Sequence, residues 1–158
     1  MNKIQKTNVA RLLDKAAIAY QLIAYEVDEN DLSAVHIADQ LNENPQQIFK
    51  TLVLQGNKTG YFVCVIPADE ELDLKKAAVV SGNKNCDLIP MKDLLPVTGY
   101  IRGACSPMGM KKKIPTYIHN SCTSFSHIFV SAGQRGLQIK IDPFDLIKIT
   151  RAIPTQLL

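Results

Sequence analysis

The sequence predicts an α+β fold with a mixed or antiparallel, barrel-like β-sheet flanked by helices. The chain has 158 residues, which suits one domain, because two domains of this size would each have an undersized core. Hydrophobic residues make up 46% of it and charged residues 21%, which is typical of a globular protein and too apolar for a disordered one. Helical and strand patterns do not alternate strictly, which argues against a doubly wound parallel sheet. We therefore expect residues 1–158 to form a single domain.

The first half of the chain is predicted to hold short helices around one β-hairpin. Apolar residues at helical spacing predict helices, and apolar runs bounded by turn residues predict strands. Ser33 suits a helix N-cap, and Asn44-Pro45 suits the cap and first position of a further helix. The predicted helices are residues 8–17, 33–41, 44–49 and 72–80. The predicted strands are residues 20–27, 51–54 and 61–66, of which the last two form the hairpin.

The second half of the chain is predicted to consist mostly of strands. These strands are residues 86–89, 99–102, 114–119, 127–131 and 137–141. Residues 133–136, with a glycine at each end, suit the loop of a hairpin between the last two strands. Asp142-Pro143 suits the start of a final helix that continues to about Arg151.

Charge is unevenly distributed along the chain. The formal net charge is only +3, which by itself does not indicate a nucleic-acid-binding protein. Acidic residues are concentrated in the first half and basic residues in the second, so the molecule can present a basic face to a polyanion. No signal-peptide-like segment and no apolar run of bilayer length occurs, so we expect a cytoplasmic protein without a membrane partner.

The sequence lacks the common catalytic and metal-binding motifs. It contains no nucleophile elbow, phosphate-binding glycine loop or metalloprotease helix. The four cysteines have no C-x-x-C pair and are expected to be free thiols, and the three histidines are isolated in sequence. No structural-zinc spacing occurs, so we expect neither a metal nor a cofactor. A nucleophilic Cys105 paired with a histidine in space stays open as an alternative.

Three segments are unusual for a protein without such motifs. Lys50 lies among apolar residues at the start of a predicted strand, and an ammonium there is costly to bury unless it has a partner or a ligand. Small residues over 98–110 would let backbone N–H groups approach a carbonyl oxygen or phosphate, and three lysines follow them. The third segment, residues 131–137, contains two glycines and Arg135.

Together these segments resemble the YbaK/EbsC family of aminoacyl-tRNA deacylases, which is related to the editing insertion domain of bacterial prolyl-tRNA synthetases. The resemblance extends from about residue 7 to residue 153. The stretches that carry it are Tyr25-Glu26-Val27-Asp28, Phe49-Lys50-Thr51-Leu52, Leu72-Asp73-Leu74-Lys75-Lys76-Ala77-Ala78, Thr98-Gly99-Tyr100, Gly103 with Ser106-Pro107-Met108-Gly109 and the lysines after it, and Val130-Ser131-Ala132-Gly133-Gln134-Arg135-Gly136-Leu137.

The resemblance implies a role for each unusual segment. Lys50 matches the lysine essential for activity in the family and is the expected catalytic residue. Residues 103–109 match the loop at the aminoacyl end of the substrate, and their backbone N–H groups are expected to stabilise an oxyanion. This sequence departs from the common pattern at Ala104, often glycine, and at Arg102, often apolar. The expected substrate-binding residues are Tyr25, Tyr100, Gly103, Ala104, Ser106, Gly109, Ser131 and Gly133, and those for the tRNA acceptor end are Lys111, Lys112, Lys113 and Arg135.

The resemblance also implies a substrate and a mechanism. The expected substrate is Cys-tRNA(Pro), with Cys-tRNA(Cys) as a second one, and the expected partner besides the tRNA is prolyl-tRNA synthetase. The thiol of the mischarged cysteine would attack its own ester, so that the enzyme needs no nucleophile of its own. Two alternatives stay open: an editing enzyme for Ala-tRNA(Pro) or another mischarged tRNA that uses water, and a non-catalytic module that binds aminoacyl-tRNA or a synthetase.

Overall fold

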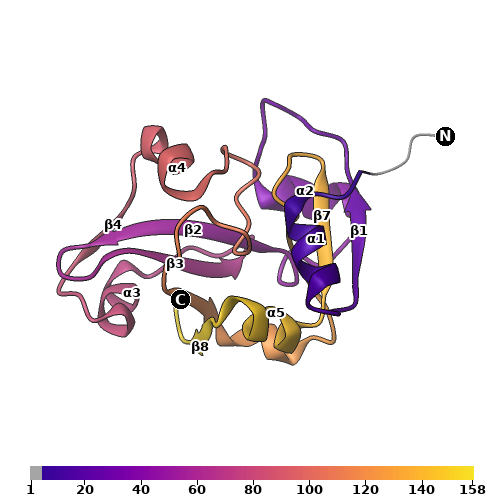
Figure 1. The fold of residues 1–158 in the computed structure, drawn as a ribbon. Coiled ribbons are helices and arrows are strands. Elements are labelled where there is room, and N and C mark those ends of the chain that lie inside the picture. Colours follow the sequence, from indigo (N-terminus) through magenta and orange to yellow (C-terminus); the bar gives the residue numbers. More distant parts are fainter. Residues whose placement is uncertain (1–4) are drawn as a thin grey trace.

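Five strands of the molecule form a mixed sheet in the order β4-β2-β3-β5-β8 (Figure 1). The computed structural model describes residues 5–158, so residues 1–4 of the predicted domain lie outside the described residues. The long β2–β3 hairpin is antiparallel, β4 is antiparallel to β2, and β5 and β8 are added in parallel beyond β3. The strands are β2 (Phe49–Gly56), β3 (Gly60–Pro67), β4 (Cys86–Leu88), β5 (Thr116–His119) and β8 (Ile153–Thr155).

A second, antiparallel sheet has the order β1-β7-β6. Its strands are β1 (Tyr20–Ala24), β6 (Ile128–Ser131) and β7 (Leu137–Ile141). The two sheets approach each other just before β2, where Ile48 forms a parallel bridge with Phe129 and the Phe129 N–H donates to the Gln47 carbonyl at 2.9 Å. The predicted α+β class with a mixed sheet is confirmed, but the strands form two sheets and do not close into a barrel.

Within residues 5–158, five α-helices and one 3-10 turn accompany these sheets, and two of the helices begin at the N-caps that the sequence predicts. The Ser33 and Asp142 side chains accept hydrogen bonds from the N–H groups of His36 and Phe144, and Gly82 ends its helix in the left-handed conformation. The helices are α1 (Asn8–Lys15), α2 (Ala34–Leu41), α3 (Leu74–Ser81), α4 (Met91–Thr98) and α5 (Pro143–Thr150), and the 3-10 turn is η1 (Asn120–Ser124).

The predicted helix over residues 44–49 is wrong. Only two successive turns form there, with the Gln47 N–H donating to the Asn44 carbonyl and the Ile48 N–H to the Pro45 carbonyl. The carbonyl of Ile48 already accepts from Ala68 at 2.7 Å. Sheet pairing therefore takes the backbone groups that a longer helix would need.

The predicted strand over residues 99–102 is also wrong. Helix α4 ends just before this segment, and the segment itself has no regular structure. Pro96 lies inside α4 and removes one backbone donor, which is why the sequence does not indicate a helix there. The Thr98 hydroxyl bonds back to the Leu94 carbonyl, and Gly99 caps the helix with φ 83°. After Gly99 the chain runs without regular structure to β5, and this irregular segment borders the cavities described below. The short strand β8 was likewise not predicted.

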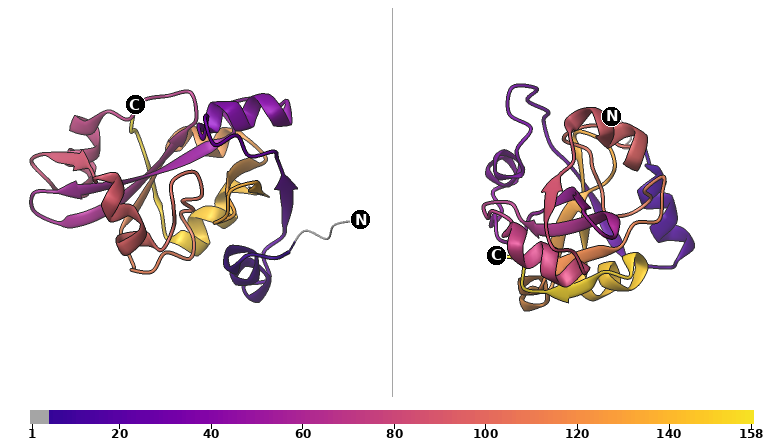
Figure 2. Two further views of the ribbon diagram at one scale, coloured as in Figure 1. Left: turned by 90° about the horizontal axis from the view of Figure 1, so that it is seen from above. Right: turned by 90° about the vertical axis from the view of Figure 1, so that its left-hand side faces the viewer.

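The main hydrophobic core joins both sheets to the terminal helices. Val9 and Leu13 of α1 and Leu146 of α5 pack in one cluster with residues of β2, β3, β6 and β7. Figure 2 shows α1 beside the three-stranded sheet and the β2–β3 hairpin extending away from it. Within residues 5–158, no helix combines the length and apolar character that a bilayer crossing would require.

Candidate functional site

A cavity of about 330 Å³ opens beside Lys50 where β2, β7 and two loops converge. We call it the Lys50 cavity. Its walls come from the loop before α2, from the start of β2, from the irregular segment after α4 and from the β6–β7 hairpin. Its lining residues are Asn30, Asp31, Leu32, Ser33, Ala34, Ile37, Phe49, Lys50, Thr51, Arg102, Gly103, Cys105, Ser131 and Gln138.

Lys50 lines this cavity, and its amine has one backbone acceptor. Its Nζ donates to the carbonyl of Ala68 at 3.2 Å, just beyond the end of β3. Burial lowers the pKa of the Lys50 ammonium, and the nearby carboxylates of Glu71, Asp69 and Glu70 oppose that shift. A half-buried ammonium with a single hydrogen bond keeps donors available for an oxygen of a bound molecule.

Two residues that line this cavity carry buried polar atoms without hydrogen-bond partners. Thr51 Oγ1 and Gln138 Oε1 are inaccessible to solvent and have no partner within the described part of the chain. Gln138 is only 3% exposed and lies in β7 between Leu137 and Ile139, which are both buried. An unsatisfied buried polar group is costly, so each of these atoms would be stabilised by a hydrogen-bond partner.

Sequence reasoning missed Gln138 and did not assign a role to Thr51. The available signal was a polar residue inside an apolar strand, in the run Leu137-Gln138-Ile139. Its register also pairs it with Ser131 across the β6–β7 hairpin, beside a loop that the sequence already singled out.

Gly103 brings the irregular segment into the wall of the Lys50 cavity. Its φ is 85°, and a Cβ built there would lie 3.3 Å from side-chain atoms of both Arg135 and Leu32. Only glycine tolerates this backbone conformation without strain. Within residues 5–158 the N–H groups of Gly103 and Cys105 have no assigned acceptor, whereas the Ala104 N–H donates to the Ile101 carbonyl at 3.0 Å.

Hydrogen bonds from two side chains connect the segments around residues 103–105 and 131–135. The Ser131 hydroxyl donates to the Ala104 carbonyl at 2.9 Å and accepts from the Gly133 N–H at 3.1 Å. The Arg135 Nε donates to the Arg102 carbonyl at 2.8 Å. Ser131 and Arg135 therefore fix the cavity wall through hydrogen bonds to the backbone.

Cys105 lines the cavity, but its thiol is not activated. Burial raises the pKa of Cys105 to about 12, and a hydrogen bond with Thr98 opposes that shift. At neutral pH this thiol is therefore protonated, whereas the thiolate is the nucleophilic form. This argues against the Cys105–histidine alternative.

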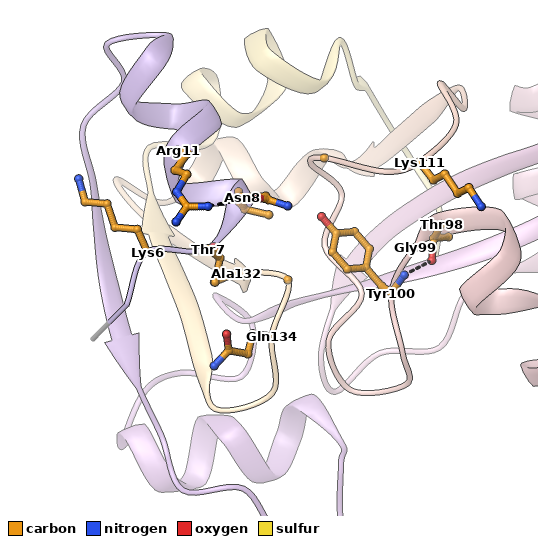
Figure 3. A pocket seen from close by; sticks show the side chains of 13 residues that line it. Lys6, Thr7, Asn8, Arg11, Thr98, Gly99, Tyr100, Lys111, Ala132 and Gln134 are labelled. Atoms are coloured by element: carbon orange, nitrogen blue, oxygen red, sulfur yellow. Dashed lines mark hydrogen bonds between the residues drawn. The ribbon is translucent and has the colours of Figure 1, made fainter. Parts of the chain in front are cut away.

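Three of the predicted substrate-binding residues line a different cavity, of about 520 Å³, beside helix α1 (Figure 3). We call it the α1 cavity. Tyr100, Gly109 and Gly133 border it together with Lys111, one of the predicted tRNA-binding lysines. The Tyr100 hydroxyl donates to the Met108 carbonyl, and burial raises the pKa of Tyr100 to about 12, so this side chain stays neutral.

The remaining predicted residues line neither cavity. Tyr25 follows β1, where its N–H donates to the Gly136 carbonyl at 2.9 Å. Ser106 is fully buried and accepts from the Met108 N–H at 3.3 Å, so its hydroxyl shapes the turn. Lys112 and Lys113 are exposed, with the Lys112 Nζ 5.9 Å from the ring centre of Tyr61. Among residues 5–158, no three potential metal-ligating side chains gather in one place.

Comparison with known proteins gives matches over most of the chain. The Aminoacyl-tRNA editing domain family matches residues 28–149. An Enterococcus faecalis protein with the provisional name Cys-tRNA(Pro)/Cys-tRNA(Cys) deacylase EbsC is 47% identical over 146 residues, covering 92% of this chain and 89% of that protein. A proline–tRNA ligase of Brachyspira hyodysenteriae is 25% identical over 139 residues, covering 87% of this chain but only 24% of the ligase.

Solved structures share the fold at low sequence identity. A crystal structure of a protein described provisionally as a trans-editing enzyme for prolyl-tRNA synthetase has a TM-score of 0.82 at 20% identity, covering 97% of this chain and 98% of the other. The crystal structure of the hypothetical protein APE2540 has a TM-score of 0.87 at 19% identity, covering 96% and 99%. At such identities the similarity shows the fold alone.

Proposed function

Because this chain belongs to the aminoacyl-tRNA editing domain family, we propose that it is a trans-editing deacylase that removes cysteine from mischarged Cys-tRNA(Pro). Cys-tRNA(Cys) is a second substrate, and residues 1–158 act as one deacylase domain. The observation that carries this proposal is the Lys50 cavity, which combines a half-buried amine with two buried polar atoms that lack partners.

The cavity suits an ester whose own acyl group supplies the nucleophile. No side chain that lines it is an activated nucleophile, since the Cys105 thiol stays protonated. A free cysteine thiol has a pKa of about 8.5, so a few per cent of the bound substrate is thiolate at neutral pH. Holding the ester and its neighbouring sulfur in attack geometry makes the reaction intramolecular and removes the entropic cost of bringing the two groups together.

The chemical step is an intramolecular acyl transfer. The substrate sulfur forms a bond to the ester carbonyl carbon, and the bond from that carbon to the ribose oxygen breaks. The thiol proton ends on the ribose hydroxyl of the released tRNA, and a cyclic thioester leaves and later hydrolyses in water. Lys50 stabilises the developing negative charge, with the N–H groups of Gly103 and Cys105 as further donors to the oxyanion.

The rest of the cavity binds the α-ammonium and holds the acyl group. Asp31 lines the cavity, and hydrogen bonds from Ser33 lower the pKa of its carboxyl, so it is anionic at neutral pH. This carboxylate and the Gln138 amide oxygen are acceptors for the α-ammonium of the aminoacyl group. Thr51 Oγ1 completes the polar set on the β2 side.

Prolyl-tRNA synthetase is the expected partner that supplies tRNA selectivity. A proline pocket rejects cysteine weakly, because a few missing contacts are worth only about 1–3 kcal/mol. The match to part of a proline–tRNA ligase supports a shared substrate. A pull-down of the synthetase with this protein and tRNA(Pro) tests the association.

The decisive test is a deacylation panel on Cys-, Ala-, Ser- and Pro-tRNA(Pro) with the wild type, Lys50→Ala and Cys105→Ala. We expect rapid loss of cysteine only, no activity in Lys50→Ala and substantial activity in Cys105→Ala. Fast cleavage of Ser- or Ala-tRNA(Pro) would show that water attacks and that the substrate sulfur is not needed. Binding of charged tRNA without turnover would favour a non-catalytic module.

A further inference from the structure

The α1 cavity is the larger of the two cavities, and the proposed chemical step does not use it. It lies between helix α1, the start of the irregular segment after α4 and the tip of the β6–β7 hairpin. Figure 3 shows Asn8 and Arg11 on one side, Tyr100 across from them and Gln134 below. Its lining residues are Lys6, Thr7, Asn8, Val9, Arg11, Thr98, Gly99, Tyr100, Gly109, Lys111, Ala132, Gly133 and Gln134.

The two cavities lie on the two sides of the same pair of loops. In the β6–β7 hairpin Ser131 lines the Lys50 cavity, and Ala132, Gly133 and Gln134 line the α1 cavity. In the other loop Tyr100 lines the α1 cavity, and Arg102 and Gly103 line the Lys50 cavity. Two residues of chain span at most about 7 Å, so the cavities are neighbours at the scale of one nucleotide.

The α1 cavity has the side chains that bind an anion. Lys6, Arg11 and Lys111 line it, and none of the described residues that line it is acidic. Lys6 already pairs with Asp14 at 2.6 Å and extends away from Tyr100 in Figure 3. Of the five donors of the Arg11 guanidinium, the described structure pairs one, with Asn8 Oδ1 at 3.3 Å. A guanidinium fork with donors to spare matches two oxygens of a phosphate.

Near the Arg11 guanidinium lie side chains that suit the binding of a nucleoside. The amides of Asn8 and Gln134 can donate to and accept from base edges or a 2′-hydroxyl, and Gln134 is exposed at the hairpin tip. A Cβ on Gly133 would lie 3.0 Å from the Tyr100 ring, so glycine at this position allows the hairpin tip to pack closely against that ring.

We propose that the α1 cavity binds the nucleotide that precedes the aminoacylated adenosine, with the phosphate on Arg11 and the base beside Asn8 and Gln134. This inference rests on the proposed deacylase function. It assigns to Arg11 a part of substrate affinity, distinct from the chemistry at Lys50. Lys111 lies at the opposite edge of the cavity and extends away from Arg11 in Figure 3, so it contributes long-range attraction for the nucleic-acid backbone.

The test compares 3′-O-cysteinyl-adenosine with the cysteinyl-CCA trinucleotide. We expect the wild type to cleave the trinucleotide with a kcat/KM about tenfold higher, chiefly through a lower KM. Arg11→Gln should lose most of that advantage and cleave cysteinyl-adenosine as the wild type does. Arg11→Lys should keep part of it, because the charge remains. Lys15→Gln, an exposed cation of the same helix that does not line the cavity, is the matched control.

Two results would overturn the inference. One is an equal kcat/KM of the wild type for both substrates, and the other is an equal loss on both substrates in Arg11→Gln. If the wild type cleaves neither substrate, deacylation of Cys-tRNA(Pro) decides the proposed function separately, and titration with uncharged CCA trinucleotide decides the binding claim. Weaker binding in Arg11→Gln than in Lys15→Gln supports the site, and equal binding refutes it.

Discussion

The Lys50 cavity and the α1 cavity share two loops but differ in how their polar groups are satisfied. In the Lys50 cavity an amine is partly desolvated, and the buried oxygens Thr51 Oγ1 and Gln138 Oε1 have no partner within the described residues. In the α1 cavity the side chains of Lys6, Arg11 and Lys111 are exposed, so their charged groups are hydrated. Buried unsatisfied groups suit orientation and chemistry, whereas exposed charges add salt-dependent affinity. On this difference rests our proposal that the Lys50 cavity performs the reaction and the α1 cavity binds the nucleic-acid backbone.

The largest effect should come from Lys50→Met, which removes the ammonium and keeps the length of the side chain. We expect kcat for Cys-tRNA(Pro) to fall by about 10²–10³-fold, the usual loss for one oxyanion donor. The free energy of unfolding should not fall, because burial already disfavours the charged form. Single-turnover deacylation and urea unfolding measure the two quantities. The control is Lys148→Met on the exposed face of α5, and a loss of stability in Lys50→Met alone would mean a structural role.

The pH profile of deacylation should be bell-shaped if Lys50 works as an ammonium and the substrate works through its sulfur. The rate should rise about tenfold per pH unit until the substrate thiol ionises near pH 8.5. It should fall again as Lys50 deprotonates, at a pH below the ordinary 10.5 because its pKa is lowered. Lysine charge is lost as pH rises, so the descending limb belongs to Lys50. Rates corrected for spontaneous ester hydrolysis give the profile, and a plateau without a descending limb would remove the ammonium from the mechanism.

An intermediate effect is expected from Gln138→Met and Thr51→Val, which replace unsatisfied polar groups by apolar ones of similar shape. Each should raise the free energy of unfolding by up to about 1 kcal/mol, because no hydrogen bond of the protein is lost. Each should lower kcat/KM about tenfold, the value of one hydrogen bond to the substrate. Gln21→Met on the exposed side of β1 is the control. Lower stability together with unchanged activity would mean that these atoms have no role toward the ligand.

The smallest effect concerns ionic strength and Lys111 at the edge of the α1 cavity. For single strands each phosphate contact contributes about 0.7 to the slope of log affinity against log salt. Raising the salt about fourfold should therefore raise KM for Cys-tRNA(Pro) roughly 2.6-fold for each contact. Lys111→Gln should reduce this slope by one contact at most, and cleavage of cysteinyl-adenosine should not respond to salt. An unchanged slope in Lys111→Gln would limit the phosphate contacts of this cavity to Arg11.

Elements with strong local sequence signals could be predicted from the sequence, whereas elements without such signals could not. Helix caps at Ser33 and Asp142 and the β2–β3 hairpin follow from neighbouring residues, and the structure confirms them. Helix α4 was missed because Pro96 contradicts its local signal. The turns at residues 44–48 stay short because sheet pairing claims the backbone of Ile48. The second error shows a tertiary partner outweighing local preference, whereas the first shows a helix forming despite a residue that disfavours it.

By itself the sequence determined the α+β class, the family resemblance and the singular position of Lys50, because each depends on residue types in a local order. The tertiary structure decided which predicted site residues share a cavity, since Lys50, Gly103 and Ser131 meet on one side of the loops and Tyr100, Gly109 and Gly133 on the other. The tertiary structure also identified Gln138 as a lining residue of the Lys50 cavity and Arg11 as a lining residue of the α1 cavity. Segments distant in sequence decide whether a polar atom is buried without a partner and whether a cation lines a cavity. Only folding brings those segments together.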